Sequence, residues 1–341
     1  MRLSPLLLAL LLATQSVHAQ PVEPATRQRV VEAAVAQIQD GYVDAAAGAK
    51  IKAALLREPH AFDGIADSQA FADRLTERLQ AAVPDRHLHV EYSAQPLQLG
   101  PMPAAQRERN RQRERELAER SNNGVERVER LPGNIGYIDL RRLAHPAWAA
   151  GTLAAAMTLV AHTDALLVDL RENTGGYPAT AALVASYLFD ARTHLVDIYW
   201  RDGDRTEQYW TQDSVGGLRF GQAKPVWVLT SPRTFSGAES LAYDLKNHKR
   251  ATLVGETTGG GANPGKFVAL TEHFGLMLPT GRAVSPITHG NWEGTGVEPD
   301  VKVDAALALV TAQRLALAHL IAAAPDAAGR AELQQHLDAL R

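Results

Sequence analysis

Cysteine is absent from the 341 residues of this chain, which excludes disulfide bonds, thiolate metal ligands and a thiol nucleophile. Charge of one sign is also lacking, because 35 Lys and Arg residues nearly balance 38 Asp and Glu residues. The formal net charge of −3 gives no overall attraction to nucleic acid or to an anionic membrane. The stretch HLH places His87 and His89 on one face of an expected strand, but no third metal ligand is evident. We therefore expect no metal, no cofactor and no nucleic-acid partner.

The N-terminal apolar run, Leu6 to Leu12, is much shorter than the roughly 20 residues that cross a bilayer. It follows Arg2 and precedes small residues that end at Ala19, a pattern typical of a secretory signal peptide. We predict a signal peptide over residues 1–19, export to a periplasm or to the medium, and no membrane association after cleavage.

The next segment is rich in apolar residues at helical spacing, which predicts a small N-terminal helical domain over residues 20–100. After it, QRERNRQRERELAER at 106–120 mixes Arg and Glu with almost no apolar residue. These charges largely cancel, so a solvated helix or a flexible linker fits better than a nucleic-acid-binding arm. We interpret residues 101–130 as a charged linker without chemistry of its own.

Beyond the linker, short apolar runs alternate with Ala-rich helical segments. The runs are IGYIDL at 135–140, ALLVDL at 165–170, VWVL at 226–229 and TLVG at 252–255. This alternation predicts an α/β fold with a largely parallel sheet, whose ligands bind at the carboxyl ends of the strands. We expect one domain over residues 131–341, in which 267–281 adds a hairpin to that sheet and a helix from about Asp304 ends the chain.

Two loops that follow expected strands carry candidate chemistry. In DLRENTGGYPAT, Gly175 and Gly176 precede a helix and can present backbone N–H groups to an oxyanion. In TSPRTFSGAE, Ser236 precedes Gly237, whose N–H is a second candidate oxyanion donor. Ser236 also fits a capping box with Glu239, which has no catalytic meaning. The two interpretations of Ser236 are compatible with each other.

Two further loops contain residues that could carry chemistry. Gly260–Lys266 resembles the start of a phosphate-binding loop, but Phe267 stands where Ser or Thr should hold magnesium, so we expect no nucleotide. In NWEGTGVEPD, Glu293 follows Trp292 and could orient a catalytic partner or lie in an exposed turn.

The motifs DLRENTGG, TFSGAESLAYDLKNHKRATLVGETTGGGANPG and WEGTGVEPD, in this order along the chain, resemble peptidase family S41, the tail-specific or C-terminal processing peptidases. The likeness covers roughly Gly133 to Val303 and is strongest to the subgroup with retinol-binding-protein-like repeats and the tricorn protease catalytic domain. It implies a ClpP/crotonase-like αβ fold and peptide-bond hydrolysis through a serine acyl-enzyme. Ser236 matches the family nucleophile, Gly237 and the DLRENTGG glycines match the oxyanion donors, and Glu293 resembles an acidic residue of the tricorn branch.

The general base of the family is not visible in its expected places. The processing peptidases carry a lysine where this chain has Gly261, with Lys266 five residues further on, and the tricorn branch carries a histidine where this chain has Asp139. A serine hydroxyl needs a neighbouring base to act as a nucleophile near neutral pH. We take His145 as the candidate base, with His289 as the other histidine considered.

The sequence therefore predicts an exported serine peptidase that acts on peptides or proteins. The alternative is a catalytically weak relative that binds an apolar ligand or a peptide, which the missing base would favour. The intact serine and glycine loops favour the enzyme, because a passive binder has no evident use for an oxyanion site.

Overall fold

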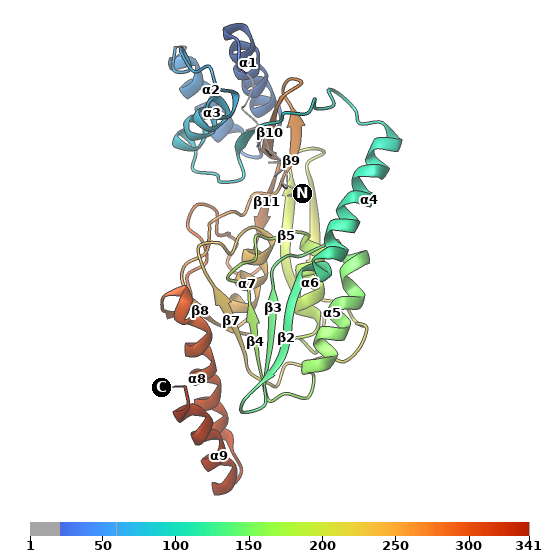
Figure 1. Ribbon diagram of the computed structural model, residues 1–341, viewed down its shortest axis with the longest axis vertical. Helices are drawn as coiled ribbons and strands as arrows, with labels where there is room; N and C mark the ends of the chain where they lie inside the picture. Colours follow the sequence, from blue (N-terminus) through green and yellow to red (C-terminus); the bar gives the residue numbers. More distant parts are fainter. Residues whose placement is uncertain (1–20, 59, 341) are drawn as a thin grey trace, which may run out of the picture.

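The computed structural model describes residues 21–58 and 60–340, so the signal peptide predicted over 1–19 lies outside the described residues. The chain is elongated, with three helices at one end, a central sheet flanked by helices, and a helical hairpin at the other end (Figure 1).

A six-stranded sheet forms the centre of the molecule, in the order β12-β8-β7-β4-β3-β2. Neighbouring strands are parallel except for β2 and β3, which are antiparallel. The predicted α/β fold with a largely parallel sheet is thus confirmed. The strands are β2 (Val125–Leu131), β3 (Ile135–Leu140), β4 (Ala165–Asp169), β7 (Val226–Thr230), β8 (Thr252–Gly255) and β12 (Val301–Lys302).

Helices cover both faces of this sheet, which explains why its strands are apolar on both sides. Alternate residues of one strand go to opposite cores: Val168 of β4 packs with α5, α6 and α7, whereas Leu167 packs with α8. The expected C-terminal helix begins after Asp304, and a further short helix follows it. These helices are α5 (Pro146–Val160), α6 (Pro178–Ser186), α7 (Gly237–Asn247), α8 (Ala305–Ala323) and α9 (Ala327–Asp338).

Two smaller antiparallel sheets lie above the central one. Their strand orders are β1-β10-β9 and β11-β5-β6. The hairpin predicted near residues 267–281 exists as β9 and β10, but it pairs with β1 instead of joining the central sheet, which corrects that prediction. The strands are β1 (His89–Tyr92), β5 (His194–Trp200), β6 (Arg205–Trp210), β9 (Gly265–Ala269), β10 (Phe274–Pro279) and β11 (Gly281–Val284).

The N-terminal helices pack on the β1-β10-β9 sheet and share one core with it. The helices are α1 (Pro24–Gly41), α2 (Ala45–Arg57) and α3 (Ser68–Ala82). Phe71 of α3 meets Phe274 of β10 edge to face, with ring centroids 5.4 Å apart. Leu75, Leu79 and Leu276 are fully buried in the same cluster. This packing holds the turn between α3 and β1 against β10.

The charged stretch 106–120 lies within a single exposed helix, α4 (Ala104–Arg120), beside α5 (Figure 1). Ala118 is its one buried residue, in keeping with the lack of apolar residues in the sequence. The predicted linker 101–130 also contains the 3-10 turn Asn122–Gly124 and most of β2, so its last part belongs to the central sheet.

Within the described residues, one helix, α8, is long and apolar enough to cross a membrane. Its face formed by Ala308, Ala312, Ala316 and Leu317 is buried against the sheet. This packing accounts for only part of its apolar character, because Leu307 on the same helix is 55% exposed.

Candidate active site

Ser236 lies at the junction between β7 and α7, where the chain turns sharply from the strand into the helix. Its backbone has φ 54° and ψ −122°, a conformation that ordinary residues adopt at a cost of roughly 1–3 kcal/mol. Such a strand-turn-helix junction lifts a serine hydroxyl out of the turn toward solvent or substrate. The Phe235 N–H, which donates to the Asn173 carbonyl at 3.0 Å, helps to hold the turn in place.

Glu239 of α7, which is fully buried, fastens this turn to the loop that follows β8. Its carboxylate accepts the Ser236 N–H at 2.8 Å, the Gly260 N–H at 2.6 Å and the Gly261 N–H at 2.8 Å. Burial raises the pKa of Glu239, and these hydrogen bonds oppose that rise. Glu239 thus forms the predicted capping box with Ser236, and the same carboxylate also organises the loop over residues 258–261.

Two backbone amides lie beside the Ser236 hydroxyl. A Cβ built on Gly237 would lie 2.8 Å from the Gly176 oxygen and 3.3 Å from its nitrogen, so the two glycines are in close contact. The Gly175 N–H is taken by the Asn173 side chain at 2.8 Å. Gly176 and Gly237, by contrast, line a cavity together with Ser236. Their N–H groups are thus the pair available to an oxyanion.

His87 is the histidine in contact with the serine. Its Nε2 lies 3.1 Å from Ser236 Oγ, although 149 residues separate the two in sequence. The imidazole packs on the Phe235 ring, with centroids 4.6 Å apart. The Arg86 guanidinium lies over the same Phe235 ring, 5.2 Å from its centroid. Burial lowers the pKa of His87, which keeps the ring neutral and able to accept a proton.

Two carboxylates stand close to His87. Asp85, Glu293 and His87 each place a nitrogen or oxygen atom within 4.8 Å of the others. The fully buried Asp85 accepts from the His87 backbone N–H at 2.9 Å, the Tyr42 hydroxyl at 2.8 Å and Asn263 Nδ2 at 3.0 Å.

Glu293 has fewer hydrogen-bond donors around its carboxylate than Asp85 has. Its Oε2 accepts the Ala262 N–H at 2.6 Å, while its buried Oε1 has no hydrogen-bond partner. Burial, followed by the charge of Asp85, raises the pKa of Glu293 to about 8. His87 Nδ1 is likewise buried without a partner. An alcohol next to a neutral imidazole, with carboxylates behind it and two free amides beside it, can carry out acyl transfer.

The structure places the other base candidates elsewhere. His145 caps α5, where its Nδ1 accepts the Ala147 N–H at 3.2 Å, and its ring packs against Trp148. His289 is exposed in the loop after β11, and Lys266 is exposed on β9. The prediction of His145 as the base is therefore wrong, and neither His289 nor Lys266 takes its place. The side chain that contacts Ser236 Oγ is His87.

His87 was missed because the sequence HLH looked like one strand face. The strand β1 begins only at His89, which binds Glu91 at 2.9 Å, whereas His87 lies in the preceding turn and faces the serine. The signal available in the sequence was the Asp85-Arg86-His87 order, a carboxylate two residues before an imidazole. The third group near His87 comes from Glu293, far along the chain.

In the described part of the chain, Asp85, His87 and Glu293 form the single group with the side-chain types and spacing of a metal site. His87 is already hydrogen-bonded to Ser236, and Asp85 is already surrounded by donors. These hydrogen bonds are compatible with proton transfer between Ser236 and His87.

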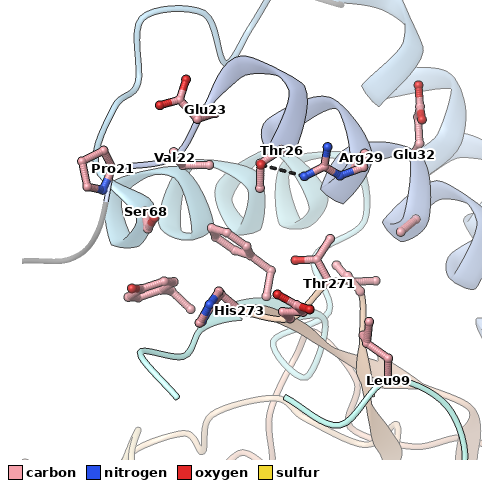
Figure 2. Close-up of a pocket in the computed structure, with 15 residues that line it drawn as sticks. Pro21, Val22, Glu23, Thr26, Arg29, Glu32, Ser68, Leu99, Thr271 and His273 are labelled. Atoms are coloured by element: carbon pink, nitrogen blue, oxygen red, sulfur yellow. Dashed lines mark hydrogen bonds between the residues drawn. The ribbon is translucent and has the colours of Figure 1, made fainter. Parts of the chain in front are cut away.

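A cavity of about 70 Å³ opens beside Ser236, next to the two amides. Its walls are mainly apolar and include Ile198 of β5, Ala283 of β11 and the buried Trp292. A larger hollow of about 750 Å³ lies between α1 and the β9–β10 turn, where Arg29 donates to Thr26 at 2.9 Å (Figure 2). The two hollows share no lining residue, so the larger one is separate from the serine site.

Comparison with known proteins gives consistent results. Residues 134–303 match the sequence model of peptidase family S41. The chloroplastic carboxyl-terminal-processing peptidase 2 of Arabidopsis thaliana is 29% identical over 180 residues, which cover 51% of this chain and 34% of that protein. The carboxy-terminal-processing protease of Bartonella bacilliformis is 29% identical over 182 residues, 51% of this chain and 40% of that protein. The chain therefore spans well under half the length of these relatives.

The fold is similar to that of a lipoprotein from Streptococcus agalactiae, with a TM-score of 0.56 and 15% identity over 87% of this chain and 98% of that one. The segment that matches the family model contains Ser236, while His87 lies outside it, in the N-terminal part. Through residues 134–303, the chain belongs to peptidase family S41.

Proposed function

We propose that this protein is a serine peptidase that hydrolyses peptide bonds through an acyl-enzyme on Ser236, with His87 as the general base. The contact of 3.1 Å between His87 Nε2 and Ser236 Oγ is the observation that carries the proposal. A neutral imidazole at hydrogen-bond distance is what a serine needs to become a nucleophile.

The proton path follows from this contact. As Ser236 Oγ bonds to the substrate carbonyl carbon, its proton passes to His87 Nε2, and the carbonyl oxygen gains the charge that the Gly176 and Gly237 N–H groups stabilise. When the carbon–nitrogen bond breaks, the imidazolium returns that proton to the leaving amine. Water then repeats the sequence on the acyl-enzyme and releases the acid. Loss of one such oxyanion donor typically costs about 10²–10³ in kcat.

We further propose that the protein is exported, as the N-terminal sequence pattern predicts. Peptides or unfolded protein segments are the proposed substrates. The alternative, a catalytically weak binder, was favoured by the missing base, and the position of His87 removes that reason.

The first test is labelling with a fluorophosphonate, followed by intact-mass measurement. Activated Ser236 Oγ attacks phosphorus and expels fluoride, so we expect one adduct per chain. Ser236→Ala should abolish it. Ser231→Ala is the matched control, because Ser231 lies in the same turn but donates to the Arg171 carbonyl. Absence of an adduct in the folded wild-type protein at any pH tested would favour the binder.

The small cavity predicts which substrates are cleaved. At about 70 Å³, it should accept Ala or Val on the acyl side of the cleaved bond and reject Phe or Lys. We expect kcat/KM to favour the small residues by at least about tenfold, since one methylene in such a pocket is worth roughly 10–200-fold. A peptide series that varies only this position measures the preference.

Ile198→Val removes one methyl from the cavity wall and should raise kcat/KM for Leu relative to Val. Ile138→Val is the matched control, because Ile138 is equally buried, at 4% exposed against 3%, but does not line the cavity. Both variants should lose about 0.5–1.5 kcal/mol of stability. An unchanged Leu/Val ratio in Ile198→Val would show that another surface selects the substrate.

A further inference from the structure

The site holds one imidazole and two carboxylates, and the two acids have very different surroundings. Asp85 accepts from three donors that come from different parts of the chain: Tyr42 at the end of α1, Asn263 after β8, and the His87 backbone. All three are donors, as an ionised carboxylate requires. Glu293 keeps one oxygen buried without a donor.

We propose that Asp85 is the positioning residue of this catalytic site: it fixes the His87 turn and supplies the negative charge that balances the imidazolium formed during the reaction. This inference rests on the proposed function. It assigns to Asp85 the role that the sequence pattern suggested for Glu293.

The geometry supports both parts of this role. Asp85 Oδ1 bonds to the backbone of His87 two residues later, and the Leu88 N–H donates to the Asp85 carbonyl at 3.1 Å, which closes the turn. Tyr42 and Asn263 hold Oδ2 from the helical part and from the loop after β8. The carboxylate thereby links both parts of the chain at the base of the active site. A negative charge held behind an imidazole stabilises its protonated form in the transition state.

Other charged groups around the imidazole and Glu293 do not take over this role. Arg86 and His89 flank His87 in sequence, and their charges lower its pKa, whereas Asp85 raises it. Near Glu293, the charges of Asp85 and of the hydrogen-bonded Glu239 both raise the pKa, with Asp85 the larger effect. Asp85 therefore favours the protonated form of both His87 and Glu293.

The sign of this effect gives a distinctive prediction for Asp85→Asn. The active base is the deprotonated imidazole, so the rate rises with pH through the apparent pKa of the site that contains His87. Removing the Asp85 charge destabilises the protonated forms and moves this limb to lower pH. At the same time, the imidazolium in the transition state loses its counter-charge, and the maximal rate should fall by about 10²-fold or more.

The experiment measures kcat/KM of the full-length protein from about pH 5 to about pH 10, using a peptide with Ala before the cleaved bond. A merely structural role would lower the rate without moving the limb in the acid direction. If Asp85→Asn is folded and its pH limb lies where that of the active wild type lies, the inference is overturned. Absence of fluorophosphonate labelling in the wild type would instead refute the proposed function itself.

A second pair of variants keeps the inference testable if Asp85→Asn does not fold. Tyr42→Phe removes one donor from Asp85, and Tyr137→Phe removes the same kind of bond, a tyrosine hydroxyl 2.8 Å from the buried Asp169. Both should lower the melting temperature to a similar degree. We expect Tyr42→Phe alone to reduce kcat, by roughly tenfold, because Asp85 loses one of the hydrogen-bond donors that hold it beside His87. Equal kcat values in the two variants would overturn the inference.

Discussion

His87→Gln is expected to lower kcat/KM for peptide hydrolysis by roughly 10³–10⁴-fold, since loss of one member of a serine triad typically costs this much or more. Glutamine has nearly the reach of histidine but cannot accept a proton from Ser236 near neutral pH. Because the His87 side chain already lies 3.1 Å from Ser236 Oγ, the loss should appear in kcat and not only in KM. Fluorophosphonate labelling should slow in parallel.

His89→Gln is the matched control for this prediction. His89 lies two residues away in the same HLH stretch, but its ring binds Glu91 on the exposed side of β1. The control should keep wild-type activity, and its free energy of unfolding should stay within about 0.5 kcal/mol of the wild-type value. His145→Gln should also keep wild-type activity, because that ring caps α5, but loss of the cap should cost about 0.5–2 kcal/mol of stability. Near-wild-type hydrolysis by His87→Gln would place the general base elsewhere.

The parts of the site that the sequence predicted are those that depend on local patterns. Ser236 and Gly237 were found because an apolar strand, a turn and a helix follow one another without a gap in the chain. Gly175 and Gly176 were found for the same reason, and the predicted parallel sheet brings both turns to one edge. Adjacent parallel strands fix this juxtaposition without any knowledge of distant contacts.

His87 and Asp85 depend on packing that no local pattern encodes. Their turn reaches Ser236 because β1 pairs with β10 and because the α1–α3 helices share a core with that sheet. The hairpin had been expected in the central sheet, and in that position nothing would have carried residues 85–87 to the serine. Long-range pairing of this kind depends on side-chain packing over many residues, and a one-residue slip would reverse every side chain.

Gly261 provides the second large effect, because it occupies the position where the family resemblance implies a lysine. A Cβ at residue 261 would lie 2.3 Å from Phe235 Cζ and 2.7 Å from His87 Cε1. Atoms do not approach this closely, so any side chain at this position must displace one or both rings. A lysine side chain at position 261 and the His87 imidazole in its present place therefore exclude each other. This steric conflict explains why a chain that uses His87 has glycine at position 261.

Gly261→Ala should accordingly lower kcat/KM by about 10²-fold, the usual cost of moving a catalytic group by roughly 1 Å. The backbone at Gly261 does not need a positive φ, so the added methyl acts through the collision and not through backbone strain. Gly151→Ala is the control, because a Cβ on this α5 glycine meets nothing within 4 Å and should stabilise the helix by about 0.5–1 kcal/mol. Wild-type activity in Gly261→Ala would mean that the His87–Phe235 stack can shift without loss of function, and that the 3.1 Å contact with Ser236 does not limit catalysis.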